Sequence, residues 1–263
     1  MILAALLLGC TATDTPATDD TAADTTADVF TPPAAPDNGV QVLIDGFTVE
    51  PYSELEHCRY IKTENAVAGK VVRMELVGKD GLHHAFVTKS SQDLADGEEE
   101  CFGLPDAAMQ DYSDVPEPLF ASSTQVATET IEFPEGVAVN LDANQQLIFN
   151  YHYLNVTDEP IEGEIYLNLY FADEGAEPET ANLFVFGNMS SIDVPAGETA
   201  SLTSTCAFDE DTNLFSVTPH MHAMGSGFSF TRESTGEVLL ETEGWSNPET
   251  LYMEPSLSVA AGE

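Results

Sequence analysis

From residue 39 to the end of the chain, short runs of β-branched and aromatic residues alternate with turn signals. Pro134-Glu135-Gly136 and Asp158-Glu159-Pro160 are two such turn signals, and no stretch keeps a long helical period. Many short strands with frequent turns are typical of antiparallel sandwiches and barrels. The sequence therefore predicts an all-β fold. The predicted strands lie at residues 40–49, 66–77, 83–88, 125–133, 145–155, 162–171, 183–194, 199–208, 227–231, 237–243 and 256–259.

The chain length favours two domains, because 263 residues exceed the size of a typical single domain. An acidic segment containing Gly and Pro, residues 173–182, is the predicted linker. It separates an N-terminal domain, residues 39–172, from a C-terminal domain, residues 183–263. The last residues read as a strand followed by the start of a turn, so we expect the second domain to be incomplete.

The N-terminus is typical of an export signal. Residues 2–8 form an apolar run too short to span a bilayer, and Leu7-Leu8-Gly9-Cys10 resembles a bacterial lipobox. Residues 1–10 are thus a predicted signal and lipobox segment, with Cys10 as the lipidated residue. Residues 11–38 are mostly Thr, Ala, Asp and Pro, and this composition predicts a disordered tether. We expect an exported lipoprotein anchored to the cell envelope, in the periplasm or at the cell surface.

The charge and the cysteines narrow the expected partners and the compartment. Seven Lys and Arg against 46 Asp and Glu give a net charge of −39, which disfavours nucleic acid as a partner and leaves the lipid anchor as the membrane contact. Export places Cys58, Cys101 and Cys206 in an oxidising compartment, where disulfides persist. Cys58 and Cys101 bracket a histidine pair and are the preferred disulfide, which leaves Cys206 without a partner.

Five of the six histidines occur in three short clusters. The pair His220 and His222 has the two-residue spacing that places both rings on one face of a strand. Adjacent residues such as His83 and His84 face opposite sides of a regular strand, so they share a metal only where the strand is bulged or at an edge. Gly81 just upstream makes such a distortion easier. The remaining histidines are His152, between two tyrosines, and His57, which we expect to be structural.

Each cluster alone is compatible with ordinary strand histidines, but together they indicate metal sites, since imidazole is a common ligand of copper and zinc. The order HH, HY and HxHxxG resembles the copper type II, ascorbate-dependent monooxygenases, the family of dopamine β-monooxygenase and peptidylglycine α-hydroxylating monooxygenase. The resemblance covers residues 40–263. It extends to the context of the histidines, which consists of Phe133-Pro134-Glu135-Gly136-Val137, Val194-Pro195-Ala196-Gly197-Glu198 with Cys206, Asn247-Pro248 and residues 252–262.

The resemblance implies two antiparallel jelly-roll β-sandwich domains, each with one copper ion. His83, His84 and His152 would bind the electron-transfer copper, and His220 and His222 the catalytic copper. In the family, ascorbate reduces both coppers and O2 is used to hydroxylate a C–H bond. The expected partners are therefore a small organic substrate, O2 and a reductant such as ascorbate.

Two departures from the family pattern qualify these expectations. The third ligand of the catalytic copper is a methionine on a later strand, which would lie beyond Glu263. Family members that act on glycine-extended peptides also have an arginine where this chain has Thr218, so a peptide-amidating substrate is disfavoured. Two alternatives stay open: a non-catalytic copper-binding or copper-handling exported lipoprotein, and a structural or adhesive β-sandwich with scattered histidines.

Overall fold

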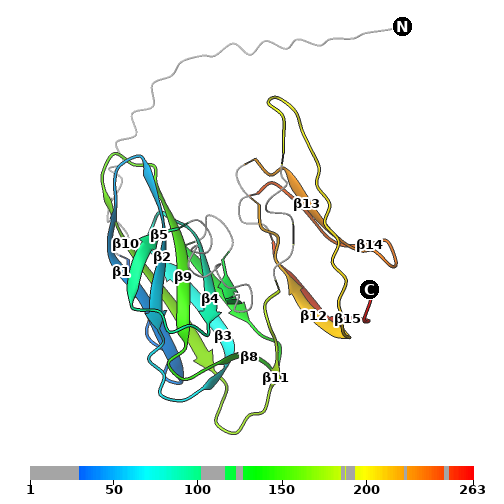
Figure 1. The fold of residues 1–263 in the computed structure, drawn as a ribbon, viewed down its shortest axis with the longest axis horizontal. Coiled ribbons are helices and arrows are strands. Elements are labelled where there is room, and N and C mark those ends of the chain that lie inside the picture. The colour runs from blue at the N-terminus through cyan, green and yellow to red at the C-terminus, as the bar shows by residue number, and fades with distance from the viewer. Residues whose placement is uncertain are drawn as a thin grey trace, which may run out of the picture. The chain divides into compact units, whose positions relative to one another are not determined.

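The structure is a computed structural model, and it describes residues 30–101, 116–122, 127–184, 187, 193–221, 224–245 and 249–263. All regular secondary structure in these residues is β-structure (Figure 1). The described residues contain no helix, and therefore none long and apolar enough to cross a membrane. The predicted all-β class is confirmed.

The first sheet has six strands, and the N-terminal strand forms one of its edges. Its neighbouring strands pair antiparallel, except for the parallel pair of the last two, and one further strand pairs with the third strand of this order. In spatial order the strands are β1 (Gly39–Val49), β10 (Ile161–Phe171), β3 (Gly69–Gly78), β8 (Val137–Leu141) and β11 (Glu179–Thr180), and the additional strand is β7 (Thr128–Glu132). The short strand β11 lies inside the predicted linker, so part of that segment extends the first sheet.

The second sheet has five strands, all paired antiparallel. In spatial order they are β5 (Gly97–Glu100), β2 (Ser53–Lys62), β9 (Gln146–Asn155), β4 (Leu82–Ser90) and β6 (Glu117–Ala121). The central strand β9 is buried along almost its whole length. Because β9 lies between β2 and β4, side chains from all three strands meet on each face of the sheet.

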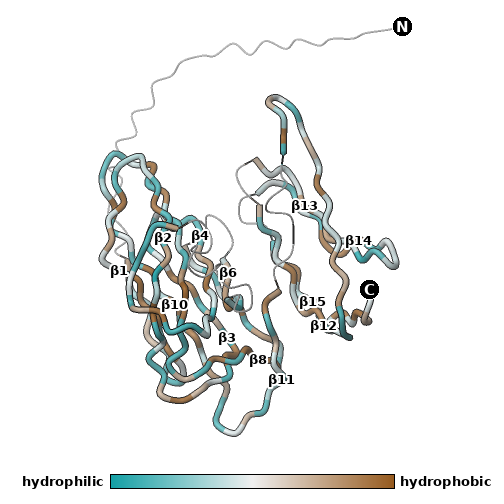
Figure 2. The backbone as a smooth tube through the Cα atoms, in the orientation of Figure 1, coloured by the Kyte–Doolittle hydropathy of each residue, from teal (hydrophilic) through white to brown (hydrophobic). Residues whose placement is uncertain are grey.

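One hydrophobic core joins the two sheets. It includes Leu167 and Leu169 of β10 in the first sheet, and Leu147 and Phe149 of β9 in the second, all with no exposed surface. Alternate residues of the long strands, such as β1 and β9, point into this core, as expected for half-buried strands. Apolar and polar segments are interspersed along the chain (Figure 2). The two sheets therefore pack as a β-sandwich. The jelly-roll topology remains an expectation from the family resemblance.

The C-terminal residues form two separate two-stranded ladders. One pairs β12 (Thr212–Val217) with β15 (Leu251–Val259), and the other is the hairpin of β13 (Gly227–Arg232) and β14 (Glu237–Glu243). Residues 199–208 form no strand, so that part of the sequence-based prediction is wrong. Three threonines and Phe208 provide β-propensity there. The segment has few large apolar residues to bury, however, and propensity alone does not form a ladder.

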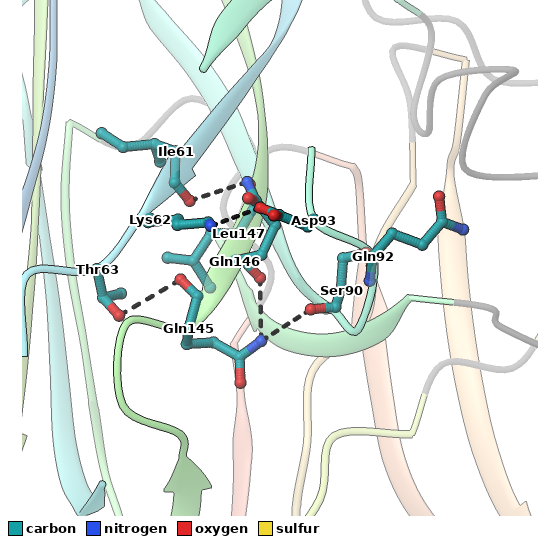
Figure 3. A network of polar contacts seen from close by, with 9 residues as sticks. All are labelled: Ile61, Lys62, Thr63, Ser90, Gln92, Asp93, Gln145, Gln146 and Leu147. Carbon is teal, nitrogen blue, oxygen red and sulfur yellow. Dashed lines mark hydrogen bonds and ion pairs between the residues drawn. The ribbon is translucent and has the colours of Figure 1, made fainter. Parts of the chain in front are cut away.

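A network of polar contacts fixes one end of β2, β9 and β4 (Figure 3). The Gln145 side-chain amide donates to the backbone oxygen of Ser90 at 3.0 Å, and the Gln146 amide donates to that of Ile61 at 3.3 Å. Lys62 also forms an ion pair with Asp93 at 2.5 Å. These contacts connect the three strands at the end remote from His84 and His152. They hold the register that brings the histidines together at the other end.

Candidate metal centre

His84 and His152 lie directly opposite each other on the neighbouring strands β4 and β9. Residues paired in this way across an antiparallel ladder project from the same face of the sheet. The adjacent residues of β9, Tyr151 and Tyr153, belong to the core, so His84 and His152 project from the outer face. The two strands thus bring together residues far apart in the sequence.

His83 reaches the same face because β4 contains a β-bulge. Leu82 pairs with Tyr153 and His84 pairs with His152, so His83 is an extra residue between two successive ladder positions. Leu82 and Ala85 both point into the core, which requires the two residues between them to face outward together. The prediction that the two histidines share a site only in a distorted strand agrees with this geometry.

Contacts on both sides of the bulge stabilise it. Gly81 has a φ of +97°, a conformation that glycine adopts readily, and its backbone oxygen accepts a hydrogen bond from the Leu154 amide at 2.8 Å. Beyond the histidines, the Ala85 amide donates to Oγ of Ser122 at 2.8 Å, and the Ser122 amide donates to the Ala85 oxygen at 2.9 Å. Backbone groups next to the bulge therefore have partners although the ladder is interrupted.

The three histidines have the geometry of a metal-binding group. One ring nitrogen from each of His83, His84 and His152 lies within 4.8 Å of the others. The ring centroids are separated by 4.8 Å for His83 and His152, 5.1 Å for His83 and His84, and 5.2 Å for His84 and His152. Metal–imidazole bonds of about 2 Å separate two ligand nitrogens by at most about 4 Å, so small ring rotations close the set on one ion.

The site rests on an aromatic layer of the core. Tyr151 and Tyr153 are fully buried, and Phe47 packs on both, with ring-centroid distances of 4.8 Å and 5.0 Å. Burial raises the pKa of both tyrosines, so they stay neutral. The Tyr153 hydroxyl donates to the backbone oxygen of Glu164 at 3.1 Å. This packing fixes the backbone that presents His152.

Strand β2 places two carboxylates beside His152. Oε2 of Glu54 lies 3.1 Å from Nε2 of His152. Glu56 is the direct ladder neighbour of His152, and its Oε1 accepts a hydrogen bond from the Asn150 side chain at 3.1 Å. Glu54 was not among the predicted site residues. Its position emerges only from the pairing of β2 with β9, which local sequence does not determine.

The predicted disulfide between Cys58 and Cys101 is confirmed. Cys58 has no exposed surface, and Asn150 approaches Sγ of Cys101 with its amide nitrogen at 3.3 Å. The bond joins β2 to the segment after β5. It therefore supports the edge of the sheet that carries Glu54 and Glu56. A disulfide here also agrees with an oxidising compartment.

The other predicted site residues that the structure describes are not part of the three-histidine group. The exposed His220 follows β12, and its ring centroid lies 5.8 Å from that of His84. His57 instead contacts Glu98, with 2.5 Å between Nδ1 and Oε1. Cys206 forms no disulfide with the other described cysteines. Two predicted residues, His222 and Cys10, lie outside the described residues.

Trp245 is a second neighbour of the site that the sequence analysis did not identify. It is the one tryptophan of the chain. Its ring is stacked on His83 with a centroid distance of 6.2 Å and an angle of 27° between the planes. An aromatic ring on a candidate ligand adds apolar surface beside the imidazole, and it provides a natural fluorescent reporter of the site.

A scan against protein-family models and a search of curated proteins find no match to this chain. The geometry by itself defines the class of site, a candidate metal centre of three imidazoles on a β-sandwich. The family resemblance rests on the pattern of histidines and neighbouring residues alone.

Proposed function

We propose that this protein is a copper-dependent monooxygenase that hydroxylates a C–H bond of a small organic substrate with O2 and a reductant such as ascorbate. The observation that supports the proposal is the convergence of His83, His84 and His152 on the outer face of the sandwich. The resemblance of the histidine pattern to the copper type II, ascorbate-dependent monooxygenases supplies the reaction type.

The donor set fits copper. All three donors are imidazoles, which suit copper, zinc, iron and nickel, and copper(II) binds most tightly in the usual order of divalent metals. Three imidazoles also leave coordination positions open. When bound, copper supplies one-electron redox chemistry and reactivity toward O2. In the proposal His83, His84 and His152 hold the electron-transfer copper, and His220 and His222 hold a second, catalytic copper.

The residues around the site perform three tasks in this proposal. The buried Tyr151 and Tyr153 keep water away from the inner side of β9 and fix the backbone at His152. The β-bulge aims His83 and His84 at one point. The excess of acidic residues gives the protein a negative potential that attracts a cation toward the surface.

A non-catalytic copper-binding or copper-handling role is the second candidate. It is favoured by the observation that His83, His84 and His152 form a three-imidazole group by themselves. Either role suits an exported lipoprotein attached through Cys10, which is part of the same proposal. The Cys58–Cys101 disulfide supports the oxidising compartment that this location requires.

Copper titration of the purified chain tests the site. We expect His83→Ala, His84→Ala and His152→Ala each to weaken Cu(II) binding by more than the 10–100-fold that loss of an outer-shell partner costs, since each removes a ligand. Bound copper is measured by elemental analysis, and binding is followed through quenching of Trp245 fluorescence. His57→Ala is the matched control, because His57 lies on the adjacent strand and contacts Glu98 instead. Equal affinity in wild type and His152→Ala would disprove the site.

Turnover separates the two candidate roles. The copper-loaded chain is incubated with ascorbate, O2 and candidate substrates, and products are analysed by mass spectrometry with isotopically labelled O2. A hydroxylated product that contains the label supports the monooxygenase. Tight copper binding with no product from any substrate supports the copper-handling role.

A further inference from the structure

We infer that Glu54 is a positioning residue for the metal centre: it accepts a hydrogen bond from Nε2 of His152 and so directs Nδ1 of that ring to the metal. The inference rests on the proposed function in one respect, that the three histidines hold copper. The direct observation is the distance of 3.1 Å between Oε2 of Glu54 and Nε2 of His152.

The strand order explains why a carboxylate on β2 orients the ring toward β4. Strand β9 lies between these two strands, and its neighbours are Glu54 and Glu56 on one side and the histidines of β4 on the other. The two nitrogens of an imidazole point away from each other across the ring. When Nε2 faces Glu54 on β2, Nδ1 is directed toward His83 and His84.

Protonation chemistry makes the hydrogen bond selective. A neutral imidazole carries one N–H donor and one lone pair, and a metal binds the nitrogen with the lone pair. An ionised carboxylate only accepts hydrogen bonds, so its partner nitrogen must be the one with the proton. Glu54 therefore keeps the proton on Nε2 and the lone pair on Nδ1. Its negative charge also makes the ring a stronger donor and favours Cu(II) over Cu(I).

Neighbouring contacts assign this task to Glu54 rather than to Glu56. Both lie on the same face of β2, two residues apart. Glu56 is the direct ladder neighbour of His152, but its Oε1 accepts a hydrogen bond from the Asn150 side chain. Glu54 occupies the diagonal position and is the one that reaches the ring. Its side chain is 70% exposed, so the contact contributes little to folding stability and Glu54 is open to substitution.

The test combines copper affinity with a measurement on the metal-free protein. We expect Glu54→Ala to weaken Cu(II) binding by roughly 10–100-fold and Cu(I) binding by less. The negative charge of Glu54 stabilises Cu(II) more than Cu(I), so its removal affects Cu(II) more. Glu54→Gln should lie between wild type and Glu54→Ala, since an amide oxygen still accepts the hydrogen bond. Glu64→Gln is the matched control, because it removes the same charge from an exposed position just beyond the other end of β2.

Nitrogen-15 NMR of the metal-free chain, at a pH where the rings are neutral, reports the hydrogen bond itself. We expect a protonated Nε2 on His152 with a hydrogen-bonded proton that exchanges slowly in wild type and rapidly in Glu54→Ala. A proton on Nδ1 in wild type, or equal Cu(II) affinities for Glu54→Ala and Glu64→Gln, would overturn the inference. Failure of the wild-type chain to bind copper would instead overturn the proposed function, and the NMR result distinguishes the two failures.

Discussion

Gly81 is the residue whose backbone most directly shapes the metal centre. Its φ of +97° is strained for residues with a side chain, and a Cβ there would lie 2.5 Å from Cδ1 of Ile161 and 3.3 Å from the oxygen of Leu154. Leu154 is also the residue whose amide donates to the Gly81 oxygen next to the bulge. The conformation of one glycine therefore connects the start of β4 to the end of β9.

Gly81→Ala should destabilise the protein by about 2–5 kcal/mol. Of this, about 1–2 kcal/mol comes from the left-handed conformation and about 1–3 kcal/mol from crowding against Ile161 and Leu154. Urea unfolding followed by circular dichroism measures the change. Gly136→Ala is the control, because Gly136 has a φ of +80° but open space where the alanine Cβ would lie, so it should cost only the backbone strain. Equal losses in the two variants would show that crowding at Gly81 is unimportant.

At the scale of an element, the bulge in β4 implies that one residue of this strand, His83, can be deleted without disrupting the fold. Removal of His83 leaves Leu82 opposite Tyr153, His84 opposite His152 and Ala85 opposite Tyr151, which is a regular ladder. We expect the shortened chain to fold, because every core residue keeps its face. Copper affinity should fall as far as in His83→Ala, since one ligand is lost. Circular dichroism, thermal unfolding and copper titration measure these outcomes.

The matching deletion is that of Phe86, which lies in the regular part of the same strand. Its removal shifts Val87, a fully buried core residue, to the opposite face together with part of the strand, so this variant should fail to fold. If the two deletions destabilise the protein equally, His83 is not the extra residue and the bulge assignment is wrong.

The same strand shows how far sequence alone predicts this site. Two adjacent histidines after a glycine indicated that a shared metal requires a bulge, and the inward-facing pair Leu82 and Ala85, three residues apart, carries the signal of that bulge. The cluster pattern predicted that His152 is a ligand. It did not predict that His152 lies opposite His84, because β4 and β9 are far apart in the sequence. Glu54 was beyond prediction for the same reason, since its role depends on a diagonal contact between β2 and β9.

The all-β class was predictable from turn signals and strand propensity, whereas several strands were not. Strand β2 was missed because its sequence, SELEHCRYIK, is rich in charged residues. It forms because both of its edges pair, with β5 and with β9. Residues 199–208 show the opposite error, since strand-favouring residues there have no ladder partner.

At the scale of the whole molecule, the charge balance determines the response to salt. Six of the seven Lys and Arg side chains are in ion pairs with carboxylates, and the 46 acidic residues exceed the basic ones by 39. Exposed ion pairs contribute at most about 1 kcal/mol each. Repulsion among the excess carboxylates extends over the whole surface and opposes the compact state. We therefore expect salt to weaken the repulsion among the carboxylates by more than it weakens the attraction within the ion pairs.

The thermal unfolding midpoint at neutral pH should consequently rise as NaCl increases from about 0.01 M to about 1 M, over which the Debye length shrinks from about 30 Å to about 3 Å. At neutral pH, protonation of the carboxyl groups does not contribute to changes in the unfolding midpoint. Hydrogen bonds from Tyr170 to Glu75 and from Lys79 to Glu164 lower the pKa of these carboxyls, so the stability they supply is complete above their ordinary pKa and is lost only as the pH falls through the lowered value. KCl is the control, since screening depends on ionic strength and not on which monovalent cation is present. A midpoint that falls with salt would mean that the six ion pairs outweigh the repulsion of all the remaining carboxylates.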